Sequence, residues 1–250
     1  MQINFAMATD IAKRETNQDR VFGKVCDICH IKNVPRGIFC VADGMGGLQD
    51  GEYAASVAVG AFEAWWEDGF KRGDSLESVF WSINDTIRQR AQAEKVLHGT
   101  TCSVLVIEGD QYQIVHAGDS RIYMIESKWP AFLNPARQLT EDHNWAEDQK
   151  RKGILSQQEI SSHPKKNLLT SCLGTFERPR IYTCAGTIKS PCSFLLCSDG
   201  LYRYINSKKL AALFRSNKDC ETLSEKLIAY ALKQGAGDNV SVVVVRPLCV

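Results

Sequence analysis

The order of strand-like and helix-like segments is the strongest constraint on the fold of this chain. Short apolar or alternating runs are typical of strands, and apolar residues at helical spacing are typical of amphipathic helices. We expect strands at residues 3–7, 21–25, 37–42, 101–107, 111–116, 122–125, 180–187, 193–197 and 240–246. We expect helices at residues 51–67, 74–97, 207–215 and 220–233, with short helical stretches within 129–180. Because strands and helices come in separate groups, the pattern favours an α+β fold over a doubly wound parallel sheet.

The chain shows no sign of a boundary between domains. No long linker rich in proline, glycine or serine and no internal repeat interrupts its 250 residues. We therefore expect one domain over residues 1–250. Asp74 is the expected N-cap of the second helix, because aspartate is a common residue at that position.

Composition excludes several classes of function. The chain has 30 Lys and Arg against 29 Asp and Glu, a formal net charge of +1, which predicts no general affinity for nucleic acid. No apolar run reaches about 18 residues, so we expect no membrane span, and the first residues show no secretory signal. The 10 cysteines lie mostly among apolar residues and are expected to be reduced, buried thiols. We expect a cytoplasmic monomer.

Four aspartates adjoin strong strand segments, each next to a glycine or another turn-forming residue: Asp43, Asp119, Asp199 and Asp238. Any one of them could simply stabilise a turn, which is a common role of aspartate. If folding brings them together, their charges repel unless protons or cations neutralise them. Carboxylate oxygens suit Mg²⁺ or Mn²⁺ better than zinc. The four together favour a site for hard metal ions.

Arg14 and Asp19 follow the first expected strand in a polar segment. An arginine fork binds phosphate oxygens in a planar, bidentate way that lysine cannot reproduce. Taken alone, Arg14 is more simply a surface residue beside a turn. Together with a pair of hard metals, it suggests hydrolysis of a phosphoester by a metal-activated water.

Seven short motifs, in this order, resemble the PPM family of metal-dependent serine/threonine phosphatases, also called protein phosphatase 2C. They are Arg14-x-x-Asn17-Gln18-Asp19, Asp43-Gly44-Met45-Gly46-Gly47, Gly99-Thr100-Thr101, Gly118-Asp119-Ser120-Arg121, Leu139-Thr140-x-Asp142-His143, Cys197-Ser198-Asp199-Gly200-Leu201 and Gly237-Asp238-Asn239. They extend over nearly the whole chain. The form Asp-Gly-Met-Gly-Gly looks like the bacterial branch.

The resemblance implies a four-layer α-β-β-α sandwich, in which two antiparallel sheets are flanked by helices. It implies two Mn²⁺ or Mg²⁺ ions and a third, weaker metal site. Asp43 would bridge the two metals, the Gly44 carbonyl would join one of them, Asp199 and Asp238 would complete the other, and Asp119 would belong to the third. Arg14 would hold the substrate phosphate, and Asp19 would contribute to the shell of water and metal.

The implied substrate is a protein phosphorylated on serine or threonine, either a Ser/Thr kinase or one of its targets. Residues 143–173 occupy the position of the family's flap, whose lysines and arginines could steer such a substrate or could be an ordinary solvated face. A non-catalytic module that binds phosphoproteins remains the alternative.

Two residues depart from the family pattern. Many members have glutamate where this chain has Gln18, which can still contact metal through water but carries no charge, so we expect weaker metal affinity. Met45 stands where many eukaryotic members have a histidine that is the proposed general acid. A methionine cannot protonate a leaving alkoxide, so another group must do so.

Overall fold

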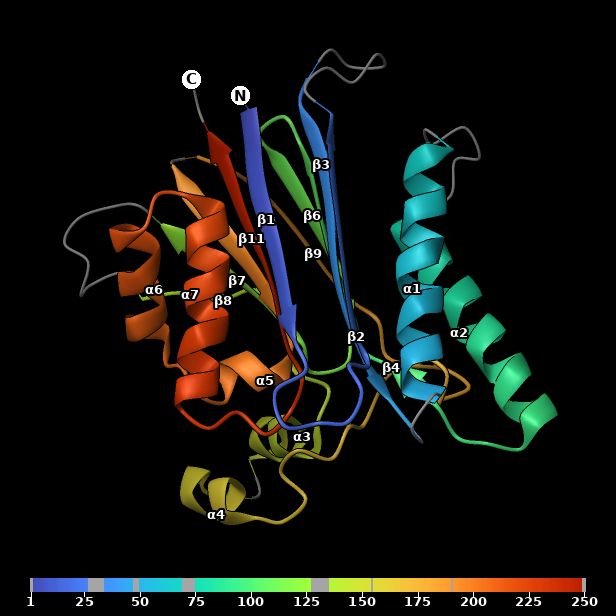
Figure 1. Cartoon of the computed structure of the whole chain (residues 1–250). Helices are drawn as coiled ribbons and strands as arrows, with labels where there is room; N and C mark the ends of the chain where they lie inside the picture. The colour runs from blue at the N-terminus through green and yellow to red at the C-terminus, as the bar shows by residue number, and fades with distance from the viewer. Residues whose placement is uncertain are drawn as a thin grey trace.

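The computed structural model describes residues 2–26, 34–46, 50–68, 75–126, 135–153, 155–189 and 191–248. Two antiparallel sheets pack face to face, and helices cover their outer faces (Figure 1). The first sheet, here the β11 sheet, has the order β1 (Gln2–Asp10), β11 (Val240–Leu248), β10 (Cys192–Cys197), β7 (Arg121–Glu126) and β8 (Arg137–Gln138). The second, here the β3 sheet, has the order β2 (Asp19–Cys26), β3 (Arg36–Met45), β5 (Cys102–Glu108), β6 (Gln111–Ala117) and β9 (Tyr182–Thr187), and β4 (Gly99–Thr100) pairs with β3.

Helices complete the outer layers. α1 (Asp50–Glu67) and α2 (Leu76–Glu94) lie on the β3 sheet, and α6 (Ser207–Ser216) and α7 (Cys220–Lys233) lie on the β11 sheet (Figure 1). α3 (Trp145–Lys152) and α4 (Gln157–Ser162) lie beyond one end of the sheets, and the short α5 (Asp199–Tyr202) directly follows β10. This arrangement confirms the expected α+β sandwich with layers α-β-β-α.

Strong apolar runs become central strands because both of their faces are covered. Residues 240–245 of β11 are all buried: alternate side chains pack against α7 and its neighbours or against the facing sheet. The layer between the sheets contains Phe39, Ile114, Phe194 and Val243. A strand enclosed on both faces cannot show the alternation of polar and apolar residues that marks a half-exposed strand. The continuous valine run is thus explained by the sandwich.

The expected N-cap at Asp74 is wrong. α2 begins at Leu76, and Ser75 is its N-cap, whose Oγ accepts a hydrogen bond of 3.1 Å from the backbone N–H of Ser78. Asp74 itself lies outside the described residues. Serine and aspartate are about equally good caps, so adjacent candidates could not be separated from the sequence.

Strand pairing brings distant motifs to one end of both sheets. Asp19 of β2 lies opposite Asp43 of β3 in the antiparallel register. Asp10 at the end of β1 lies opposite Val240 at the start of β11. The segment 11–18, which joins β1 to β2, is therefore adjacent to Asp238.

None of the described helices combines the length and apolarity that a membrane crossing requires.

Candidate active site

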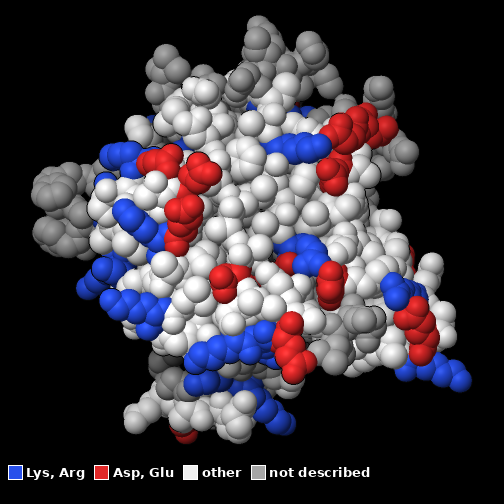
Figure 2. Space-filling view, in the orientation of Figure 1, with Lys and Arg blue, Asp and Glu red and all other residues white. Residues whose placement is uncertain are grey.

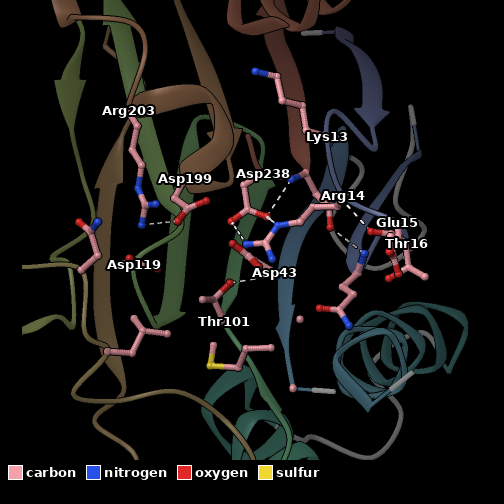
Figure 3. Close-up of a pocket in the computed structure, with 17 residues that line it drawn as sticks. Lys13, Arg14, Glu15, Thr16, Asp43, Thr101, Asp119, Asp199, Arg203 and Asp238 are labelled. Carbon is pink, nitrogen blue, oxygen red and sulfur yellow. Dashed lines mark hydrogen bonds and ion pairs between the residues drawn. The ribbon is translucent and has the colours of Figure 1, made fainter. Parts of the chain in front are cut away.

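A cavity of about 670 Å³ opens at this end of the sheets (Figure 3). The predicted site residues that line it are Arg14, Gln18, Asp43, Gly44, Asp119, Asp199 and Asp238. They come from both sheets and from turns more than 200 residues apart in the sequence. Asp19 is the exception, because it is 2% exposed and lies behind the cavity wall. The fold thus gathers the predicted carboxylates and Arg14 around one space.

Asp43 lies near the end of β3, held by the Gly99–Thr101 segment. Its backbone N–H donates to Thr101 Oγ1 at 3.0 Å, and its carbonyl accepts from the Thr101 N–H at 2.9 Å. Burial, followed by the neighbouring Asp19 carboxylate, raises the pKa of Asp43 well above its usual value. A cation placed against this carboxylate would reverse that effect, because opposite charge favours the ionised form.

Asp19 supports Asp43 from the adjacent strand. Its Oδ2 accepts a hydrogen bond of 2.8 Å from Ser198 Oγ, and Ser198 also accepts from the Ser241 N–H at 3.0 Å. Burial raises the pKa of Asp19 to about 6 despite these hydrogen bonds. The two sheets are therefore joined by a polar contact directly behind the cavity.

Asp199 is the first residue of α5, immediately after β10. Its Oδ2 forms an ion pair of 2.5 Å with Nη2 of Arg203, one helical turn later. Its Oδ1 is buried and has no hydrogen-bond partner among the described residues. Burial raises the pKa of Asp199, and Arg203 opposes that rise. An unpartnered buried carboxylate oxygen facing a cavity of like charges is a place for a cation.

Asp238 and Arg14 form a bidentate ion pair at the mouth of the cavity. Arg14 Nε donates to Oδ1 at 2.9 Å, and Nη2 donates to Oδ2 at 2.8 Å (Figure 3). Both side chains are open to solvent, with exposed fractions of 59% for Arg14 and 36% for Asp238. The guanidinium is thus available to a ligand that enters the cavity.

Asp119 lies in the turn between β6 and β7 and is 4% exposed. The turn depends on Gly118, whose φ is +110° and where an added methyl group would lie 2.5 Å from Thr101 Cβ. Tyr202 Oη donates to Asp119 Oδ2 at 3.3 Å. Burial raises the pKa of Asp119 to about 7.

Gly44 and Gln18 meet the first turn of α1. A methyl group on Gly44 would lie 2.0 Å from the Gly51 carbonyl oxygen, so only glycine fits there. The Gly44 N–H donates to the Gln18 carbonyl at 3.3 Å. Met45 also lines the cavity, and it brings no group that could transfer a proton.

Several residues with a part in this site were given no role from the sequence, although Thr101 and Asn239 stand in two of the quoted motifs. Asn239 fastens segment 11–18 to β11 through its side chain, and Arg203, Lys13 and Thr101 contribute to the cavity wall. Arg203 would have been found from its i,i+4 spacing to Asp199 if the short helix α5 had been expected. His116 is fully buried and its Nδ1 lies 2.8 Å from Ser103 Oγ in a hydrogen bond, which is the environment of a packed rather than a catalytic histidine.

The donor set of the cavity fits hard divalent cations. It offers carboxylate and carbonyl oxygens, including the unpartnered Oδ1 of Asp199. Among the described residues no three Asp, Glu, His or Cys side chains form a preassembled metal cluster. Arg14 and Arg203 pair with Asp238 and Asp199 in this arrangement. Cation binding at Asp238 would therefore displace Arg14, the residue predicted to hold phosphate.

The fold is similar to that of solved bacterial phosphatases. The serine/threonine phosphatase of S. agalactiae superposes with a TM-score of 0.85 and 25% identity, over 98% of this chain and 99% of that one. The catalytic domain of the serine/threonine protein phosphatase PstP, solved in complex with two manganese ions, has a TM-score of 0.79 and 24% identity, over 98% of this chain and 97% of that one.

Curated relatives are similar to this chain in sequence. Serine/threonine phosphatase stp of Listeria welshimeri is 30% identical over 84% of both chains, and protein phosphatase PhpP of Streptococcus pneumoniae is 30% identical over 97% of both. The family model described as protein phosphatase 2C matches residues 8–234. This chain belongs to the protein phosphatase 2C family. The predicted enzyme class, a protein-serine/threonine phosphatase, is confirmed by these relatives, and the alternative of a non-catalytic module is not supported.

Proposed function

We propose that this protein hydrolyses phosphoserine and phosphothreonine in phosphorylated proteins with two Mn²⁺ or Mg²⁺ ions. Asp43, the Gly44 carbonyl, Asp199 and Asp238 would hold the metals, and Gln18 would contact one of them through water. The observation that supports this best is the convergence of these carboxylates on one cavity in which Asp199 Oδ1 has no hydrogen-bond partner among the residues that the structure describes. The similar PstP catalytic domain that binds two manganese ions is further support.

When bound, the metal pair would activate a water and offset the charge that develops on the phosphoryl group. Arg14 would bind and orient the phosphate, since its guanidinium lies at the open mouth of the cavity. Asp19 would keep Asp43 in place and support the shell of water and metal from behind the cavity wall, because it lies opposite Asp43 and is held by Ser198. The leaving alkoxide would take its proton from solvent, because Met45 cannot supply one.

Basic side chains next to the cavity would help to attract a phosphorylated substrate. On the face seen in Figure 2, acidic and basic groups are mixed, with a band of basic side chains at the level of α3. Lys150, Arg151, Lys152 and Lys165 of the flap segment 143–173 are exposed. Lys150 and Arg151 are partly neutralised by Glu147 and Asp148, so steering would be modest and sensitive to salt.

We further propose that residues 1–250 form one phosphatase domain, and that its partner is a Ser/Thr kinase or a kinase target in the bacterial cytoplasm. The support is that the similar curated phosphatases are bacterial and match this chain over most of its length.

Hydrolysis of a phosphothreonine peptide, with Mn²⁺ and with EDTA, tests the proposal. We expect EDTA to abolish turnover and Asp199→Ala to reduce kcat at least about a hundredfold, the scale of losing one main electrostatic contribution to catalysis. The control is Asp85→Asn, an exposed aspartate of α2 that does not line the cavity. Normal turnover by folded Asp199→Ala would refute the assignment.

A further inference from the structure

Tyr202 and Arg203, which follow Asp199 in the sequence, contact two different aspartates of the cavity. Helix α5 begins at Asp199, so residues one turn later lie over its first residue. Tyr202 Oη donates to Asp119 Oδ2 at 3.3 Å, and Arg203 Nη2 pairs with Asp199 Oδ2 at 2.5 Å. One short turn of helix therefore brings a phenol to Asp119 and a guanidinium to Asp199.

The positive charge of Arg203 acts on both of these carboxylates. In Figure 3 its side chain descends to Asp199 on the side of the cavity where Asp119 lies. The same charge also acts on Asp119: burial raises the pKa of Asp119, and Arg203 is the main cation that lowers it. On the other side of the cavity Arg14 pairs with Asp238, so the two arginines do not compete for the same carboxylate.

The α5 turn is fixed in place from the outside. The guanidinium of Arg121 stacks on the Tyr202 ring with its Cζ 3.7 Å from the ring centroid. Arg121 in turn donates from Nη2 to Asp142 Oδ2 at 2.6 Å and from Nε to both carboxylate oxygens. Asp142, Arg121, Tyr202 and Asp119 thus form one continuous polar chain. Movement of Tyr202 would disrupt all of its contacts at once, which holds the adjacent Arg203 near Asp199.

The family resemblance predicts a third, weaker metal at Asp119, and this cavity does not fit one. Each of the two carboxylates that would hold a divalent ion there already has one oxygen occupied: Asp199 Oδ2 pairs with Arg203, and Asp119 Oδ2 accepts the hydrogen bond from Tyr202. The ion would also stand beside a fixed positive charge. The other oxygen of Asp199, Oδ1, is buried and has no hydrogen-bond partner in the part of the chain that the structure describes.

We propose that Arg203 takes the place of the third cation, so that this protein binds two metal ions and not three. Arg203 neutralises the pair of carboxylates permanently and leaves only Asp199 Oδ1 for a metal, whereas a weakly bound ion would come and go with its concentration. This inference rests on the proposed two-metal function.

The test counts Mn²⁺ ions per chain by equilibrium dialysis up to millimolar Mn²⁺, with calorimetric titration for affinity. We expect two ions in the wild type and in Asp119→Asn, because Asp119 holds no metal. Arg203→Ala should gain a third, weaker ion, and the double variant with Asp119→Asn should lose it again. Lys13→Ala is the matched control: it removes one positive charge from the same cavity wall, and we expect it to bind two ions.

The other outcomes distinguish failure of the Arg203 proposal from failure of the proposed phosphatase function. Three ions in the wild type, reduced to two by Asp119→Asn, would overturn the role of Arg203 and leave the phosphatase proposal intact; this comparison needs no Arg203 variant to fold. Two ions in a folded Arg203→Ala would also overturn it. A wild type that binds no Mn²⁺ would refute the proposed metal-dependent function itself, and the inference with it.

Discussion

Asn239 should couple the stability of the protein to the placement of Arg14. Its side-chain oxygen accepts a hydrogen bond of 2.9 Å from the Gln18 N–H, and its side-chain nitrogen donates to the carbonyls of Ile11 and Thr16 at 3.0 and 3.1 Å. The residue is 6% exposed, so these bonds are shielded from water. They span the segment 11–18 that contains Arg14.

The substitution Asn239→Ala removes all three bonds at once. A hydrogen bond within a protein contributes about 1 kcal/mol net, and a buried group that loses its partner costs about 1–3 kcal/mol. We expect a loss of about 3 kcal/mol in the free energy of unfolding. That is a large part of the roughly 5–15 kcal/mol by which proteins of this kind are stable. Because Arg14 loses the support of its segment, KM for a phosphothreonine peptide should also rise about tenfold or more.

Urea unfolding and steady-state kinetics measure these two effects. Asn206→Ala is the matched control, since Asn206 is the N-cap of α6 and accepts one hydrogen bond from the Lys209 N–H at 2.9 Å, away from the cavity. We expect it to lose about 1 kcal/mol and to keep normal kinetics. The proposed role of Asn239 is refuted if the free energy of unfolding of Asn239→Ala lies within about 0.5 kcal/mol of the wild-type value. It is also refuted if the KM of Asn239→Ala equals that of Asn206→Ala.

Two further perturbations test the packing and the electrostatics of the cavity. Gly200→Ala would put a methyl group 2.0 Å from the Asn239 carbonyl oxygen, so we expect it to lower the free energy of unfolding in urea by about 3 kcal/mol. The control is Gly60→Ala, where a methyl group would have none of the described atoms within 4 Å and should stabilise α1 by up to about 1 kcal/mol. Equal effects of the two substitutions would refute the close approach at Gly200. In metal-free protein, the pKa of about 7 that burial gives Asp119 lies above its usual value of 3.8. Above pH 7 the folded state is therefore destabilised by the full free energy of ionising a buried carboxylate, and this destabilisation decreases as the pH falls toward 4. We expect Asp119→Asn to be more stable than the wild type at pH 8 and to lose that advantage toward pH 4. A stability difference that does not change with pH, measured by urea unfolding in EDTA, would contradict this.

Local patterns were enough for the long elements and failed for the short ones. β10 and β11 are continuous apolar runs, and α1, α2 and α7 have apolar residues at helical spacing, so each could be predicted. β4 and β8 have two residues each and α5 has four. Elements of that length contain only about one period of the corresponding pattern, which is too short to stand out in a sequence. Their existence depends on the neighbours with which they pair.

The same difference applies to the candidate site. Asp43, Asp119, Asp199 and Asp238 could be selected because each adjoins a strong strand and a turn-forming residue. The contacts that hold them in place could not be predicted, although Thr101 and Asn239 stand in quoted motifs. The three bonds of Asn239 join residues 221 to 228 positions apart, and the Thr101 bond to Asp43 joins residues 58 positions apart.

The sequence by itself therefore determined the kinds of elements, the α+β class and the residue types that gather at the cavity, because these follow from local periodicity and from side-chain chemistry. Only the tertiary structure decided which charges neutralise each other. The pairing of Arg14 with Asp238 and of Arg203 with Asp199 depends on strand register and on a one-turn helix. Electrostatic energy changes steeply with distance and burial, and neither quantity is encoded in the order of residues alone.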